Sequence, residues 1–202
     1  MSAAFGRCYY AITLDGYVRI DDNEHDYSND QHVIELMKKY KKVALGDAIN
    51  QPIDFLPDGI THLHLDKSFN QPIMNLPQSL KELSIYSAFG TAFCDFNQSL
   101  DYLPEGLESF TMKLARNFNF PIDNFPISLK HLHFTSTTFT HPINNLPDGL
   151  ETLVIKTFDF ANTHKLPSSL RKMNINCVLL YNAHEILKRN LVDKYPNIEF
   201  DI

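Results

Sequence analysis

A proline that directly follows a leucine or a phenylalanine recurs six times along this chain, and this repetition constrains the fold more than any other feature. The pairs are Leu56-Pro57, Leu76-Pro77, Leu103-Pro104, Phe125-Pro126, Leu146-Pro147 and Leu166-Pro167. Successive prolines are separated by 20, 27, 22, 21 and 20 residues. A period of this length predicts a solenoid, in which each repeat forms one turn and stacks on its neighbours.

Apolar residues at fixed distances from each proline identify the side of the turn that faces inward. Three, six and eight positions after the six prolines stand Ile60, Leu63, Leu65, Leu80, Leu83, Ile85, Leu107, Phe110, Met112, Leu129, Leu132, Phe134, Leu150, Leu153, Ile155, Leu170, Met173 and Ile175. Four and eight positions before the first five prolines stand Ile53, Ile73, Leu100, Ile122 and Ile143, and Ile49, Phe69, Phe96, Phe118 and Phe139. The order L-x-x-L-x-L at this period is typical of a leucine-rich repeat, in which a short strand forms one side of each turn.

Two columns of small or polar residues support the same stacking. Seven positions before the proline stand Asn50, Asn70, Asn97 and Asn119, with Thr140 in the fifth repeat. We expect these side chains to satisfy backbone groups of the neighbouring turns. Two positions after the proline stand Gly59, Ser79, Gly106, Ser128, Gly149 and Ser169, and residues this small suit a tight bend before each strand.

The repeat resembles a known family. The segments Phe69-Asn70-Gln71-Pro72-Ile73 and Phe118-Asn119-Phe120-Pro121-Ile122, each followed by an apolar-Pro pair, look like the FNIP repeat, a leucine-rich-repeat variant of roughly 22 residues. The resemblance covers Asp47 to Asn176 and implies a role in protein binding. It also implies an origin in amoebae or in the large DNA viruses that infect them. The third, fifth and sixth copies depart from the pattern, since Ser99-Leu100 replaces Pro-Ile, Thr140 replaces Asn, and the last copy is one residue shorter.

The expected architecture is an α/β leucine-rich-repeat solenoid, with short parallel strands on its concave face and a mostly irregular convex side. Residues 1–46 are expected to form an N-terminal cap, 47–176 the six repeats, and 177–202 a C-terminal cap, because an open solenoid must close its core at both ends. The N-terminal cap would contain a hairpin around Asp15-Gly16, a helix from Asp30 to Tyr40, and a first strand at Val43 and Leu45. The C-terminal cap would contain a helix from Asn182 to Tyr195 and a strand from Ile198 to Ile202.

The long interval between the second and third prolines marks an insertion. Its extra residues lie between Tyr86 and Asp95 and include Phe89, Phe93 and Cys94, which have no place in the repeat. One interpretation is that these residues fold back on the convex side and fill space. The other is that they form a loop that contacts a partner.

The strand residues that alternate with the core positions must point away from the core, and they define the candidate partner-binding site on the concave face. The site consists of His62, His64, Asp66, Glu82, Ser84, Tyr86, Ser109, Thr111, Lys113, His131, His133, Thr135, Thr152, Lys156, Lys172 and Asn174. Its charge is graded, with the acidic residues near the beginning and the lysines further along. Electrostatic complementarity to a partner is one explanation, and the ordinary mixed charge of a solvent-facing sheet is the other.

Charge and cysteine content exclude several classes of partner. Eighteen Lys and Arg against 24 Asp and Glu give a net charge of -6, which disfavours binding to nucleic acid. Cys8, Cys94 and Cys177 are odd in number and far apart, so neither a disulfide framework nor a zinc site is expected. No signal peptide and no membrane span is expected, which predicts a soluble protein of the cytoplasm, the host cytoplasm if the protein is viral.

The leading functional hypothesis is a protein-protein interaction module with an unknown protein partner, no catalytic activity, no cofactor and no metal. The pairs His62/His64 and His131/His133 lie three strands apart, roughly 14 Å, too far to share one ion. One alternative is a structural or virion-associated component that self-assembles. Another is a carbohydrate-active β-helix enzyme, for which Asp66 and Glu82 are the only acidic pair on one sheet.

Overall fold

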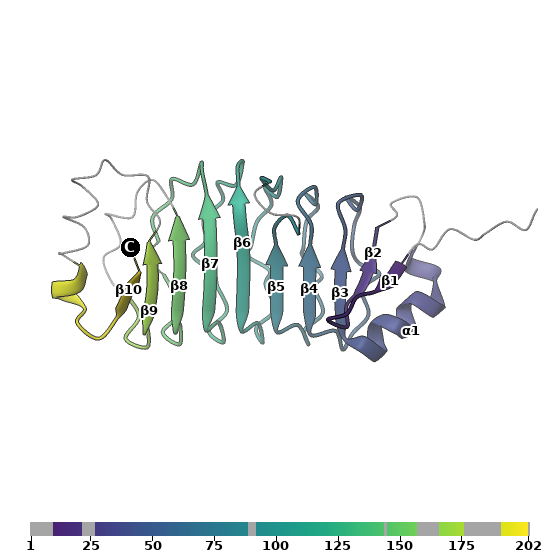
Figure 1. The fold of residues 1–202 in the computed structure, drawn as a ribbon, viewed down its shortest axis with the longest axis horizontal. Coiled ribbons are helices and arrows are strands. Elements are labelled where there is room, and N and C mark those ends of the chain that lie inside the picture. The colour runs from purple at the N-terminus through teal and green to yellow at the C-terminus, as the bar shows by residue number, and fades with distance from the viewer. Residues whose placement is uncertain are drawn as a thin grey trace, which may run out of the picture.

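The computed structural model describes residues 10–21, 27–88, 92–143, 145–156, 166–175 and 191–201. Within these residues one ten-stranded sheet follows the order of the chain, and its strands lie side by side in a row (Figure 1). The strands are β1 (Tyr10–Ile12), β2 (Val18–Ile20), β3 (Lys42–Leu45), β4 (His62–Leu65), β5 (Glu82–Ile85), β6 (Ser109–Ala115), β7 (His131–Ser136), β8 (Thr152–Lys156), β9 (Lys172–Ile175) and β10 (Glu199–Asp201). β1 pairs antiparallel with β2, and each later neighbouring pair is parallel. The predicted leucine-rich-repeat solenoid is confirmed.

The N-terminal end of the stack is closed by the hairpin and by helix α1 (Gln31–Tyr40), which follows the short 3-10 helix η1 (Tyr27–Asn29). The Asp30 side chain caps α1 by accepting a hydrogen bond from the Val33 N–H at 3.1 Å. α1 contacts β2 and β3 and buries Val33 and Met37 against them. The hairpin, the helix and the strand at Val43 and Leu45 therefore stand where the sequence predicts them.

At the other end, β10 lies within the strand predicted from Ile198 to Ile202, and it pairs parallel with β9. Leu191, Tyr195, Ile198 and Phe200 pack partly buried against the core. Residues 191–194 are helical and lie within the predicted C-terminal helix. The rest of that helix before residue 191 lies outside the described residues.

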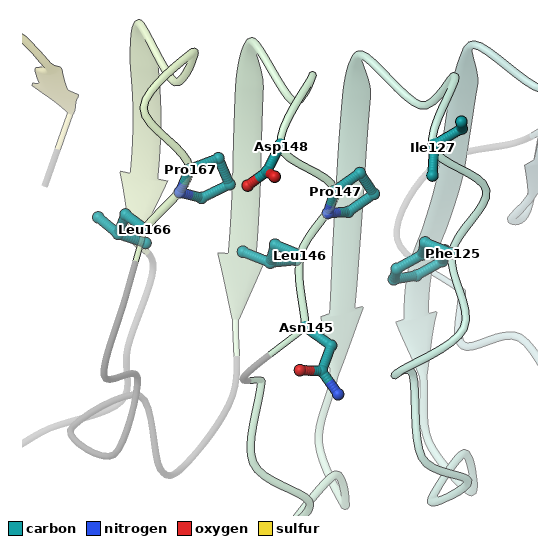
Figure 2. Close-up of a pocket in the computed structure, with 8 residues that line it drawn as sticks. All are labelled: Phe125, Ile127, Asn145, Leu146, Pro147, Asp148, Leu166 and Pro167. Atoms are coloured by element: carbon teal, nitrogen blue, oxygen red, sulfur yellow. The ribbon is translucent and has the colours of Figure 1, made fainter.

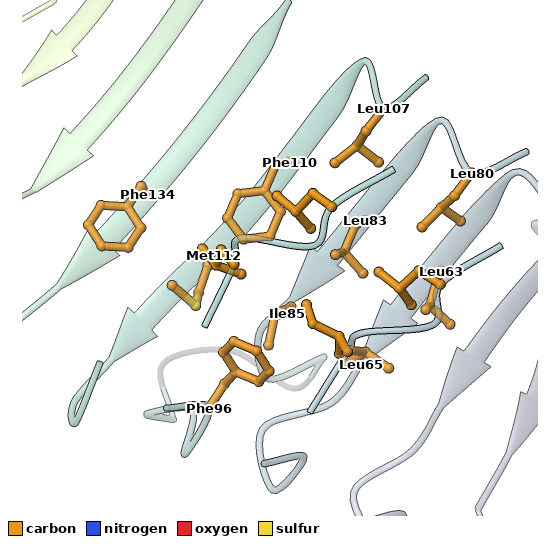
Figure 3. Packing of buried hydrophobic residues seen from close by; sticks show 14 of the residues in the cluster. Leu63, Leu65, Leu80, Leu83, Ile85, Phe96, Leu107, Phe110, Met112 and Phe134 are labelled. Carbon is orange, nitrogen blue, oxygen red and sulfur yellow. The ribbon is translucent and has the colours of Figure 1, made fainter. Parts of the chain in front are cut away.

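The inward-facing residues form one continuous core that runs along the whole stack. Every residue predicted three, six or eight positions after a proline is at most 3% exposed, wherever the structure describes its side chain. Figure 3 shows Leu63, Leu83 and Phe110 in one such column, and Leu65, Ile85 and Met112 in the next. The strand register aligns these positions, since Leu63 pairs with Leu83 and Leu83 with Phe110. The side chain of Ile175 lies outside the described residues.

A column of stacked phenylalanine rings runs through the core, and two of its rings meet Phe134 of β7 edge to face. Phe69, Phe96, Phe118 and Phe139 follow one another at centroid distances of 6.4, 6.3 and 6.3 Å, with interplanar angles of 10°, 13° and 18°. All four rings are buried. Offset stacking of this kind adds to the free energy of burying the rings, so the column links four consecutive turns.

The asparagine column forms a hydrogen-bonded ladder, as predicted. The side-chain oxygen of Asn50 accepts the N–H of Asn70 at 2.8 Å, that of Asn70 accepts the N–H of Asn97 at 2.8 Å, and that of Asn119 accepts the N–H of Thr140 at 3.0 Å. In two turns the glutamine after the asparagine strengthens the ladder. The side-chain amide of Gln71 donates to Asn50 of the preceding turn, and that of Gln98 donates to Asn70. Each bond satisfies a backbone group that the strand ladder does not reach.

Replacing Asn70 by alanine is expected to lower the free energy of unfolding by about 1–2 kcal/mol, because the Asn97 N–H and the Gln98 amide lose their acceptor. Urea denaturation followed by circular dichroism would measure the change. Gln78→Ala is the control, because Gln78 is exposed, and it should change stability by less than about 0.5 kcal/mol. Equal loss in the two variants would contradict a specific role for the ladder.

The alternating glycine and serine column contributes bonds that the sequence pattern did not predict. Each serine hydroxyl donates to a carbonyl of the turn before it: Ser79 to Ile60 at 2.7 Å, Ser128 to Leu107 at 2.6 Å, and Ser169 to Leu150 at 2.7 Å. Among the glycines, Gly59 has a positive φ of 93°, which a residue without a Cβ adopts at little cost. The column thus provides both the bend and a link between turns.

The two longest intervals between prolines have separate structural causes. In the insertion, Cys94 is buried and forms an isolated parallel bridge with Ala115 at the end of β6, whereas Phe93 is exposed. Phe89 lies outside the described residues. In the following repeat, the register between β6 and β7 shifts between Met112 and Ala115, and this β-bulge accommodates one additional residue.

Candidate functional site

The outward side chains of β3 to β9, together with the residues that directly follow these strands, form a surface that we call the sheet face. Parallel pairing places equivalent residues in rows across the strands. The central row consists of Ala44, His64, Ser84, Thr111, His133, Val154 and Asn174. The sixteen residues predicted as a candidate site therefore share one side of the sheet, because their backbone positions alternate with the core positions.

Two of these residues are buried, and the prediction that they point freely into solvent is wrong. Asp66 is 2% exposed and His64 is 8% exposed. One oxygen of Asp66 accepts the N–H of Lys67 at 2.8 Å, and the other lies 3.6 Å from the Arg19 guanidinium of β2. The ring of Tyr86 covers His64 at a centroid distance of 4.7 Å. Neighbouring turns therefore cover positions that strand alternation alone would leave exposed.

His64 is held in place from two sides. Its Nδ1 and the Ser84 hydroxyl are hydrogen-bonded at 3.0 Å, and its Nε2 is buried without a hydrogen-bond partner among the described residues. Burial lowers the pKa of His64 below its usual range, and the nearby Asp66 carboxylate only partly offsets this shift. The ring is therefore neutral near pH 7 and forms part of the floor beneath Tyr86.

Tyr86 stands at the centre of an aromatic and cationic cluster. The ammonium group of Lys113 lies 4.7 Å from the centroid of the Tyr86 ring, on β6, while His64 contacts the same ring from β4. Closer to the N-terminus, the ring of Tyr17 lies 6.5 Å from that of His62, edge to face, and Lys42 lies 5.5 Å from the Tyr17 ring. Burial raises the pKa of Tyr17, and the Glu82 carboxylate raises it further, so its hydroxyl remains protonated.

The sheet face contains two hollows that share Tyr86. The N-terminal hollow, of about 360 Å³, lies between the hairpin and the first turns and is lined by Thr13, Asp15, Tyr17, His64, Ser84 and Tyr86, with Ala44 and Ala88. The C-terminal hollow, of about 340 Å³, crosses β6 to β9 and is lined by Tyr86, Lys113, Leu114, His133, Val154 and Lys156, with Ser87, Ala92, Thr135 and Asn174. Tyr86 separates the two.

The C-terminal hollow has a positive electrostatic character in a chain of net charge -6. Lys113 and Lys156 are the only charged residues among those that line it. Burial and, to a smaller extent, the charge of Lys113 lower the pKa of His133 to about 4, so this imidazole is neutral at pH 7. A neutral histidine, a valine and a leucine between two lysines give a partly apolar site with cationic sides.

The remaining predicted residues are engaged with neighbours on the sheet face. Glu82 lies 3.5 Å from His62, and Lys172 lies 3.3 Å from Glu199 of β10. His131 and Thr152 are hydrogen-bonded at 2.9 Å, and the amide of Asn174 donates to Asp201 at 2.8 Å. Ser109 and Thr111 are half-buried on β6. The Thr135 hydroxyl accepts the N–H of Leu114 at 2.8 Å and so supports the β-bulge.

Several residues that line the hollows were not part of the predicted site, and Tyr17 and Leu114 are the two with the largest side chains. The Asp15-Gly16 turn signal identifies the hairpin that carries Tyr17, but the side chain reaches β4 only because β2 is the parallel neighbour of β3. Leu114 has no counterpart in the repeat pattern. The extra residue between the third and fourth prolines, relative to the next interval, was the available signal.

Asp66 and Glu82, the acidic pair considered for a carbohydrate-active site, lie in different surroundings. Asp66 is buried beside Arg19, whereas Glu82 is exposed beside His62, so the two carboxylates do not face a common substrate position. Burial raises the pKa of Cys94 to about 11, which leaves it a protonated thiol near pH 7. Among the described residues no group of three or more His, Cys, Asp or Glu side chains could hold a metal ion.

A third hollow lies on the side opposite the strands, where the proline turns stack. Figure 2 shows Phe125, Leu146 and Leu166 in successive turns, with Ile127 at one edge. Pro147 and Pro167 follow the two leucines and also line the hollow. Ile127 is 84% exposed, whereas the three other apolar side chains are buried. This hollow is a consequence of the spacing between turns, and it contains one charged lining residue, Asp148.

Comparison with known proteins agrees with the repeat pattern. The model of the FNIP Repeat family matches residues 42–87, which include β3, β4 and β5. Residues 42–87 therefore carry the FNIP repeat pattern. The core residues and the asparagine ladder continue beyond this matched segment, so the later turns repeat its structure.

No curated protein matches the sequence. Among solved structures, the chain is similar to CroV588, a giant-virus protein described as a novel circular LRR protein structure, with 20% identity and a TM-score of 0.38. The match covers 86% of this chain and 33% of that chain, so this chain spans about a third of the length of CroV588. Within the described residues, no helix combines the length and apolar character needed to span a membrane.

Proposed function

We propose that this protein is a non-catalytic interaction module that binds an extended segment of a partner protein across the sheet face. The observation that carries the proposal is the position of Tyr86, whose ring separates two hollows and is held between His64 and Lys113. Tyrosine is among the residues that contribute most to binding energy when a partner surrounds them.

The dimensions of the sheet face suit a peptide segment. β3 to β9 comprise six strand spacings, or roughly 29 Å at about 4.8 Å each. An extended chain covers that distance with about nine residues at roughly 3.3 Å per residue. The two hollows would accept side chains of such a segment on either side of Tyr86.

The rigidity of the sheet supports binding without a change of shape. The outward side chains stand on strands whose opposite sides are fully packed in one continuous core. Tyr86 and His64 are also fixed by ring packing, and Ser84 by its bond to His64. A surface that is already ordered loses little conformational entropy when a partner binds.

Selection of a random peptide display library against the immobilised protein is expected to enrich peptides whose binding depends on Tyr86. For a synthesised peptide from the enriched pool, Tyr86→Ala should weaken the affinity tenfold or more, roughly the effect of removing a central tyrosine from an interface. Fluorescence polarisation would measure the dissociation constant.

Tyr102→Ala is the matched control, because Tyr102 is an exposed tyrosine two residues before Pro104, on the proline turns. Its affinity for the same peptide should equal that of the wild type. If the peptides bound Tyr86→Ala as tightly as the unmodified protein, the sheet face would be excluded as their binding site.

A further inference from the structure

We propose that the C-terminal hollow is a carboxylate-binding subsite, so that the partner segment carries aspartate or glutamate side chains where it crosses β6 to β8. This inference rests on the proposed function and specifies the chemistry of its partner. Its central residues are Lys113 and Lys156, with Tyr86, Leu114 and Val154 providing the apolar surroundings.

The two lysines differ from Lys81, Lys130 and Lys172, which pair with carboxylates near the sheet. Lys81 and Lys130 both pair with Glu108, at 3.2 and 2.9 Å, and Lys172 pairs with Glu199 at 3.3 Å. Neither Lys113 nor Lys156 forms an ion pair with a residue that the structure describes, although the chain has more acidic than basic residues. These two cations therefore face a hollow in which a partner's anion would complete the pairs.

The backbone beside Lys113 has an unusual conformation that shapes this hollow. Leu114 has a positive φ of 56°, which is costly for a residue with a branched side chain, and it lies in the β-bulge between Met112 and Ala115. Such bulges commonly redirect side chains next to binding sites. Here Lys113 and Leu114, two consecutive residues, both line the hollow, whereas consecutive residues of a regular strand point to opposite sides of the sheet.

The surroundings of the lysines strengthen their interaction with an anion. Val154 and Leu114 give part of the hollow an apolar lining, and burial together with the charge of Lys113 lowers the pKa of His133, so the imidazole adds no charge to the two lysines. A carboxylate there would meet two cations in surroundings less polar than bulk water, where charge-assisted hydrogen bonds are stronger.

The spacing of the lysines indicates the spacing of the carboxylates. Lys113 on β6 and Lys156 on β8 are separated by two strand spacings, roughly 10 Å. In a polyproline II segment, which has three residues per turn, side chains three residues apart lie on the same side of the chain and are separated by roughly 9 Å. A segment that crosses the strands with acidic residues at positions i and i+3 would therefore place one carboxylate near each lysine.

The test uses the random peptide display library with four forms of the full chain: the wild type, Lys113→Gln, the double variant Lys113→Gln/Lys156→Gln, and Lys172→Gln. Peptides enriched on the wild type are expected to contain an excess of Asp and Glu, with pairs three residues apart. Each substitution in the hollow should weaken their binding by about tenfold, as the loss of a hydrogen bond to a charged group does. Lys172→Gln should have no effect, because Lys172 stands on the same sheet face but already pairs with Glu199.

Two results would overturn the inference while leaving the proposed function intact. One is an enriched pool that depends on Tyr86 but shows no acidic excess. The other is an acidic pool that the double variant still binds with wild-type affinity. A single-stranded oligonucleotide that binds the wild type more tightly than the enriched peptides, and that the double variant no longer binds, would assign the lysines to phosphate and also overturn it.

Discussion

Leu132→Asp is expected to unfold the whole stack in one cooperative transition. Leu132 stands in the middle of β7, is 1% exposed, and pairs in register with Phe110 on one side and Leu153 on the other. A carboxylate at this position would be buried between two turns without a partner, at a cost of more than about 4 kcal/mol. Because a typical domain is stable by only about 5–15 kcal/mol, the folded fraction should fall sharply.

Circular dichroism during heating and in urea would measure this loss. His131→Asp is the matched control, because His131 is the preceding residue of the same strand and points outward. It should lose only the bond to Thr152, about 1 kcal/mol. Leu132→Asp melting at the wild-type temperature would show that the repeat register is incorrect.

Phe118→Ala is expected to lower the free energy of unfolding by about 3–5 kcal/mol, the usual range for removing a buried phenylalanine. The ring of Phe118 stacks between Phe96 and Phe139 and also meets Phe134 edge to face at 5.6 Å. Its loss would leave a cavity and interrupt the phenylalanine column in the middle. Urea denaturation would give the difference in stability.

The comparison variant is Phe120→Ala, because Phe120 lies two residues along the chain and is exposed. It should lower the stability by about 1–2 kcal/mol, clearly less than Phe118→Ala, because the Phe120 ring is 37% exposed and contacts the column only at Phe118. An equal loss in the free energy of unfolding in the two variants would show that the stacked column does not stabilise the turns more than a surface phenylalanine does.

Most of the fold could be predicted from the sequence because the same physical requirement recurs in each turn. Three core positions and one asparagine per repeat are enough to fix the strands, their parallel register and the ladder between turns, as Leu63, Leu83 and Asn70 illustrate. The hairpin followed from the Asp15-Gly16 turn, and helix α1 followed from the helical spacing of Val33, Met37 and Tyr40. Local propensity and the repeat pattern agree at these positions.

The candidate site was less predictable, because it depends on contacts that break the repeat. Alternation along a strand predicts that His64 and Asp66 are exposed, yet Tyr86 covers one and Arg19 lies beside the other. Both covering residues come from other turns. The β-bulge at Leu114 is likewise a single-residue irregularity, and its position within the repeat cannot be read from the interval between prolines.

Because the strands of the sheet follow the order of the chain, the length of the sheet is set by the number of turns. Each turn consumes about 20 residues of sequence and adds one strand spacing, about 4.8 Å, to the length of the rod. Since a turn touches only the turns before and after it, inserting or removing a complete one would change the reach of the surface by a fixed increment and leave the remaining contacts as they are. The number of repeats, more than the identity of any residue, sets the length of the sheet face.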